Sequence, residues 1–144
     1  MNVKITYTGG ASFRGDTESG HSVTMDGAAE YGGENKGARP MEMLLLGLGG
    51  CTSFDVMLIL NKSRMDVRDC VAEIEAERAD SPPKVFTKIH IKFIVTGKDL
   101  DRSKVERAIK LSEEKYCSAS IMLAKTAEIT HELEIVEVPS PARL

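Results

Sequence analysis

Residues 38–60 read ARPMEMLLLGLGGCTSFDVMLIL and form a long, mostly apolar segment in the first half of the chain. Pro40 stands where an α-helix favours proline, at its first position. Apolar side chains follow almost all round the helix from 41 to 62, a pattern typical of a helix buried on every side. Asp55, two hydroxyl side chains and three glycines interrupt the apolar run, which disfavours a membrane span. The stretch therefore predicts a central, buried helix and no membrane partner.

Shorter segments on both sides of this helix predict an α+β fold with antiparallel sheets around it. Asp101 is expected to cap an amphipathic helix that runs to Tyr116, and the loop 27–39 to be exposed and mobile. Strands and helices do not alternate as βαβ units, which favours the α+β class. The expected strands cover 3–7, 13–16, 21–26, 67–79, 85–96 and 127–138, and a short helical turn covers 118–124.

The size of the chain predicts one domain over residues 1–144. With 144 residues and 42% hydrophobic content, the chain can bury one core and has little room for a second. The central helix has more apolar surface than one small sheet covers. We therefore expect a second copy of the chain to supply the missing cover in a homodimer.

Charge, the N-terminus and the cysteine count exclude several classes of protein. A formal net charge of -3 disfavours a nucleic-acid partner. The start, MNVKITYTGG, lacks the basic and apolar regions of a signal peptide. Three cysteines are too few for a disulfide scaffold. These features predict a cytoplasmic protein in a reducing environment.

Cys51 and Cys117 are the candidate reactive residues. Gly49 and Gly50 precede Cys51 in the helix, where each costs about 1 kcal/mol relative to alanine, so close approach of a backbone or a substrate is expected there. Cys51 fits either a reactive thiol or a small core residue. A chain reversal could bring Cys117 to it as a second thiol that resolves the oxidised first one. Cys70 lies in a strand pattern and is expected to be a packed strand residue without a role in the site.

A reactive Cys51 needs a nearby cation, because a position in the middle of a helix gains little from the helix dipole. Arg14 and Arg39 are the arginines of the N-terminal half that could supply the charge, and each could equally be a solvated surface residue. Glu42, in the first helical turns, either stabilises the helix N-terminus or orients one of these arginines.

The sequence predicts no cofactor and no metal site. His21, His90 and His131 are isolated on expected strands, and none has a cysteine or aspartate at ligand spacing. The paired glycines do not open a helix after a buried strand, which disfavours a phosphate-binding loop.

Two motifs resemble those of the OsmC/Ohr family. The stretch 38–60 is similar to its central-helix motif, in which a proline opens the helix, a glutamate lies close behind and a reactive cysteine follows. The segment YCSAS at 116–120 is similar to its second-cysteine motif, and the order of elements agrees over essentially the whole chain. The resemblance implies an OsmC-like fold and an intertwined homodimer with two active sites at the subunit interface.

The resemblance also implies a chemistry. Cys51 would reduce an organic hydroperoxide and become a sulfenic acid, and Cys117 would resolve it as a disulfide. A dithiol reductant would then reset the pair.

The chain departs from the family pattern beside the cysteines. Well-studied peroxidases of the family place the glutamate directly after the proline, whereas Met41 holds that position here and Glu42 comes next. One residue turns a helical side chain by about 100°. The loop segment AEYGGENKG also lacks the family's arginine. These departures resemble a less characterised branch and leave an alternative, a non-catalytic dimer that binds a small apolar ligand or senses oxidants.

Overall fold

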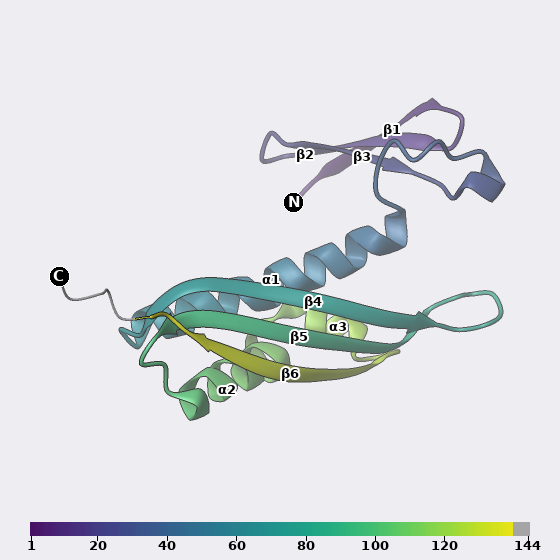
Figure 1. Cartoon of the computed structure of the whole chain (residues 1–144). Helices are drawn as coiled ribbons and strands as arrows, with labels where there is room; N and C mark the ends of the chain where they lie inside the picture. Colours follow the sequence, from purple (N-terminus) through teal and green to yellow (C-terminus); the bar gives the residue numbers. More distant parts are fainter. Residues whose placement is uncertain (140–144) are drawn as a thin grey trace. The chain divides into compact units, whose positions relative to one another are not determined.

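The computed structural model describes residues 1–139 and divides into two compact units. The first unit comprises Met1–Leu46 and the second begins at Gly47. The expectation of one domain over 1–144 stays a prediction, and its last five residues, 140–144, lie outside the described part. Strands and helices combine in an α+β fold, as the sequence predicts (Figure 1).

The first unit contains an antiparallel meander of three strands. The strands are β1 (Val3–Gly9), β2 (Ser12–Thr17) and β3 (Ser22–Asp26), in the order β1-β2-β3. Gly9 and Gly10 form the first turn with φ of 106° and 58°, which only glycine adopts without strain. The three strands predicted before the central helix are confirmed.

Asp26 holds the backbone of the glycine-rich loop that follows β3. Its side chain is buried. Oδ1 accepts a hydrogen bond from the amide of Gly27 at 2.8 Å. Oδ2 accepts hydrogen bonds from the amides of Glu34 at 2.9 Å and Lys36 at 3.1 Å. The amides of Glu34 and Lys36 hold the pKa of Asp26 below its usual value. The loop contains a short helix, η1 (Ala29–Tyr31), and much of it is exposed as predicted. The sequence did not predict that the Asp26 side chain binds the backbone of this loop.

The long helix α1 spans Pro40–Lys62 and begins at the predicted proline. Its buried residues recur every fourth position in one stripe: Leu48, Thr52, Val56 and Leu60. Other large apolar side chains remain exposed in a single chain, and Phe54 is 67% exposed. The prediction of a helix buried on every side is therefore wrong for one chain, because its own elements cover only this stripe.

Helix α1 is long and apolar enough to cross a membrane, by length and composition alone. Core helices of soluble proteins pass the same test. Asp55 lies within the apolar run, where its carboxylate accepts a hydrogen bond from another element, as described below. A charged group with a partner on a neighbouring helix favours a place for α1 inside the protein.

The second unit is built on a mixed sheet of three strands in the order β4-β5-β6. β4 (Asp66–Arg78) and β5 (Phe86–Lys98) form the predicted antiparallel hairpin, whereas β6 (Glu128–Glu137) pairs with β5 in parallel. The prediction of antiparallel sheets is confirmed for the first sheet and for the β4–β5 pair, and it is wrong at the β5–β6 pair. A long helical connection separates β5 from β6, and such a crossover lets the chain return in the same direction.

Three helical segments make this connection. Asp101 caps α2 (Arg102–Leu111) by accepting the amide of Ser103, as predicted. The π-helical segment η2 (Ser112–Tyr116) and the short helix α3 (Ser118–Leu123) follow. Cys117 lies between them, at the chain reversal that the sequence suggests.

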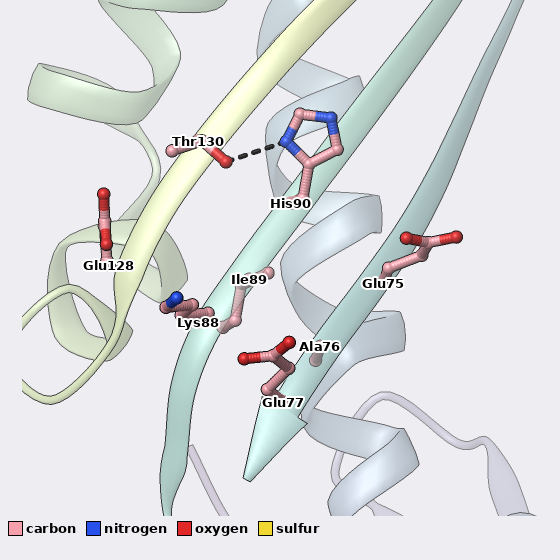
Figure 2. Close-up of a pocket in the computed structure, with 8 residues that line it drawn as sticks. All are labelled: Glu75, Ala76, Glu77, Lys88, Ile89, His90, Glu128 and Thr130. Atoms are coloured by element: carbon pink, nitrogen blue, oxygen red, sulfur yellow. Dashed lines mark hydrogen bonds between the residues drawn. The ribbon is translucent and has the colours of Figure 1, made fainter.

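The core of the second unit lies between its sheet and its helices. Alternate residues of β5 are fully buried on one face, and α1 and α2 contribute their own buried stripes. Gly49 of α1 lies so close to β4 that a Cβ there would be 3.1 Å from Ile74. The close neighbour of Gly49 is thus a sheet side chain and not the expected backbone or substrate, and within the described residues nothing lies within 4 Å of a Cβ at Gly50. The opposite face of the sheet carries charged residues, and the helices lie behind it in Figure 2.

Candidate functional site

Cys51, Asp55 and Cys117 meet in the second unit. One sulfur from each cysteine and one carboxylate oxygen of Asp55 all lie within 4.8 Å of one another. Cys51 and Asp55 are four residues apart on α1 and therefore share one helix face. Cys117 comes from the junction of η2 and α3. Two thiols that are distant in the sequence are thus neighbours in the fold.

Ser112 fixes two of these three residues. Its hydroxyl donates to Oδ2 of Asp55 across 2.9 Å, and its carbonyl accepts the amide of Cys117 across 2.7 Å. The side chain is fully buried at the first position of η2. π-Helical turns interrupt the regular ladder of an α-helix and often occur at functional sites. Here the turn positions Cys117 over α1.

Cys117 is fully buried, whereas Cys51 is partly exposed. The amide of Ser120 donates to Sγ of Cys117 across 3.3 Å, so the sulfur caps α3. Burial and, next, the contact with Cys51 raise the pKa of Cys117 to about 12. Cys117 therefore carries its proton at neutral pH, and Cys51 is the thiol of this pair that solvent reaches.

Cys70 lies apart from this cluster on β4, as predicted. Burial, and then the neighbouring charge of Asp69, raise the pKa of its thiol. Both causes disfavour the reactive thiolate.

The other three predicted site residues make their described contacts in the first unit. Glu42 accepts the main-chain amide of Arg39 at 2.8 Å, which caps the start of α1. The guanidinium of Arg39 donates to Asn35 and to the carbonyl of Gly37. Catalytic roles for Glu42 and Arg39 stay predictions.

Arg14 is held within its own sheet. Its guanidinium donates to Oδ1 of Asp16 at 2.9 and 3.0 Å, and to Ser22 at 3.4 Å. Asp16 therefore balances its charge locally. A catalytic role for Arg14 likewise stays a prediction.

A cavity of about 540 Å³ adjoins the cluster and shares Asp55 with it. Lys62 and Tyr116 contribute polar groups to its wall. Its apolar lining comes from Leu58, Ile59 and Leu111. Such a mixture suits a small ligand with an apolar body.

Sequence reasoning missed Asp55 and Ser112. The spacing of four between Cys51 and Asp55 was a usable signal, because helical residues four apart are neighbours. Ser112 gave no comparable signal, since its role depends on where η2 meets α1.

A second cluster of titratable groups surrounds His131 of β6. Its ring nitrogens face Glu113 at 2.9 Å and Glu106 at 3.1 Å, and these contacts, that with Glu113 foremost, raise the pKa of His131 to about 9. Oε1 of Glu113 is buried without a hydrogen-bond partner in the described structure. The prediction that His131 is isolated is wrong, because its partners come from α2 and η2.

A separate pocket of about 420 Å³ lies on the charged face of the second sheet (Figure 2). His90 accepts or donates a hydrogen bond with Thr130 at 2.7 Å, and Glu75 and Glu77 line the rim. The buried core of the second unit lies on the other face of this sheet. The pocket shares no residue with the Cys51–Asp55–Cys117 cluster.

Comparison with known proteins decides the family. The family model described as OsmC-like protein matches residues 33–132, which contain the whole of α1 and the Cys51–Asp55–Cys117 cluster. This chain belongs to the OsmC-like family. Among its relatives, Protein YhfA of Escherichia coli strain K12 is 44% identical over 136 residues, which cover 94% of this chain and 98% of YhfA.

Two solved structures share the fold. A hypothetical protein from Aquifex aeolicus VF5 is 31% identical with a TM-score of 0.79, covering 93% of this chain and 96% of that one. The organic hydroperoxide resistance protein OhrB of Bacillus subtilis is 20% identical with a TM-score of 0.62, covering 93% and 98%. These bacterial proteins support the α+β architecture described above.

Proposed function

We propose that this OsmC-like protein is a thiol-dependent peroxidase that reduces organic hydroperoxides in defence against oxidative stress. The observation that carries the proposal is the approach of the Cys51 and Cys117 sulfurs to within 4.8 Å. Relatives of the same fold, such as OhrB, are named for organic hydroperoxide resistance. The partly exposed Cys51 would be the peroxidatic residue and the buried, protonated Cys117 the resolving one.

In the proposed first step, the sulfur of Cys51 attacks the terminal oxygen of the hydroperoxide and the O–O bond breaks. One oxygen stays on Cys51 as a sulfenic acid, and the other leaves as an alcohol with the proton that the Cys51 thiol gives up. Cys117 then attacks the sulfur of Cys51, a disulfide forms, and water leaves with the Cys117 proton. A dithiol reductant restores both thiols and becomes a disulfide itself.

The proposed assembly is an intertwined homodimer. Phe54 and Leu46 of α1 are 67% and 63% exposed in one chain. Large apolar side chains exposed together on one element are typical of a protein–protein interface. A second copy that covers this face would bury them. A cytoplasmic location is part of the same proposal, because a reducing compartment keeps both thiols available.

Turnover of an organic hydroperoxide, compared with hydrogen peroxide, tests the function. The wild-type protein with a dithiol reductant is expected to consume the organic substrate faster. Cys51→Ser should abolish consumption, whereas the matched control Cys70→Ser should retain it. Unchanged turnover in Cys51→Ser would reject the proposal.

The cavity beside Asp55 supports one alternative, a non-catalytic protein that binds a small apolar ligand or senses oxidants. Leu58, Ile59 and Leu111 give it an apolar wall. This alternative would be favoured if the wild-type protein consumed no hydroperoxide but bound such a ligand, and if the Cys51→Ser/Cys117→Ser variant bound it equally well.

A further inference from the structure

The Cys51–Asp55–Cys117 cluster has the donor atoms of a metal site as well as those of a redox pair. Its two sulfurs and one carboxylate oxygen lie within 4.8 Å of one another. Zinc binds thiolates at about 2.3 Å in a tetrahedron, which separates two sulfurs by about 3.8 Å. The separations in the cluster therefore exceed this zinc-bound distance by about 1 Å at most.

The side chains that would hold the ion are themselves oriented. Ser112 donates to Oδ2 of Asp55 and leaves the second oxygen of that carboxylate for a metal. The amide of Ser120 donates to the sulfur of Cys117, a contact that also stabilises a metal-bound thiolate. Each of these two donors thus has the supporting hydrogen bond that metal ligands commonly have.

Loss of the two thiol protons would create the negative charge that a bound cation balances. In its metal-binding form the site would hold two thiolates and one carboxylate. Within residues 47–139, no lysine, arginine or histidine forms an ion pair with Asp55. A divalent ion would neutralise two of the three negative charges in a partly buried place, where unpaired charge is most unfavourable.

The donor set selects the kind of ion. Two sulfurs favour a soft or borderline ion over magnesium or calcium, and one carboxylate is compatible with zinc. Three protein ligands leave the fourth position of a tetrahedron for water. Asp55 also lines the adjoining cavity, so this carboxylate lies where a water ligand could enter.

We propose that reduced Cys51 and Cys117, together with Asp55, bind one Zn²⁺ ion per chain. Coordination and disulfide formation exclude each other, because each uses both sulfurs. Bound zinc would therefore protect the thiols from hydroperoxide, and oxidation to the disulfide would release the ion. This inference does not depend on peroxidase activity, since a reduced thiol pair is its only requirement.

Titration of the reduced full-length protein with Co²⁺, followed by displacement with Zn²⁺, tests the site. Thiolate-to-cobalt charge transfer and tetrahedral visible bands are expected at one ion per chain. Zn²⁺ should remove both signals. Cys51→Ser and Cys117→Ser should lose the charge-transfer band, and Asp55→Asn should weaken binding at least about tenfold.

Cys70→Ser and Asp69→Asn are matched controls outside the cluster and should bind as the wild type does. Circular dichroism checks that every variant is folded. Should a cysteine variant unfold, wild-type protein alkylated at its thiols replaces it and is expected to bind no cobalt. Absence of thiolate charge transfer in the reduced wild type, or its persistence in both cysteine variants, would overturn the metal site.

Because no hydroperoxide is present in the titration, its result is separate from that of the turnover assay. Binding without turnover would support the metal site and reject the peroxidase. Turnover without cobalt binding would support the peroxidase and reject the metal site.

Discussion

Ser112 donates a hydrogen bond to Asp55 across 2.9 Å and so ties η2 to α1 at the point where the two thiols meet. The same residue accepts the amide of Cys117. The position of the second cysteine therefore depends on a buried hydroxyl and a π-helical turn. The proposed redox and metal chemistry both require this link.

Replacing Ser112 by alanine should weaken the link. Loss of one buried hydrogen bond to a charged group is expected to destabilise the fold by about 1–3 kcal/mol and to slow disulfide formation. Chemical denaturation and quenched-flow mass analysis would measure these effects. Ser118, which is exposed nearby, provides the control Ser118→Ala, for which less than about 0.5 kcal/mol is expected. Equal effects of the two variants would contradict the account.

The two thiols should differ in reactivity. Cys117 is fully buried and its pKa is about 12, whereas Cys51 is partly exposed. Iodoacetamide at mildly alkaline pH is therefore expected to modify Cys51 first and Cys117 only slowly. Peptide mapping at successive times would measure both rates. Faster labelling of Cys117 in folded protein would show that the fold does not protect it.

His131 should make stability depend on pH. Its folded pKa of about 9 exceeds the ordinary value of 6.5, so the stabilisation is full below about pH 6.5 and is lost as the pH rises through about 9. Because Glu106 is partly exposed, solvent weakens its interaction with His131. We therefore expect the cluster to contribute of the order of 2 kcal/mol to the free energy of unfolding at low pH. The difference in unfolding free energy between wild type and His131→Gln, followed with pH, measures it. A difference that does not shrink at high pH would be inconsistent with this cluster.

The exposed face of α1 should mediate assembly. Introducing charge at Phe54, which is 67% exposed, is expected to convert the proposed dimer into monomers. Light scattering after size exclusion would compare Phe54→Glu with wild type. Glu114→Gln, an exposed change on η2, serves as the control and should remain dimeric. A monomeric wild type would refute the proposed assembly.

Local signals in the sequence predicted most elements of the fold. Pro40 starts α1 and Asp101 caps α2, because both act through neighbouring backbone groups alone. The direction of β6 was not predictable in the same way. Whether β6 runs parallel or antiparallel to β5 depends on the path of three helical segments, which no local pattern specifies.

The candidate site was predictable in part. The sequence singled out Cys51 and Cys117, but their approach depends on how η2 and α1 pack. The carboxylates beside His131 belong to α2 and η2, so the sequence could not predict their contact with β6 either. Asp55 is different, since its spacing from Cys51 placed it on the same helix face from the start.

The disulfide that forms when reduced protein receives one equivalent of an organic hydroperoxide identifies the thiols that react. Mass spectrometry of the digested protein, without reductant, would map it. We expect a disulfide between Cys51 and Cys117, with Cys70 still a free thiol. No loss of thiols, or a disulfide that includes Cys70, would contradict it.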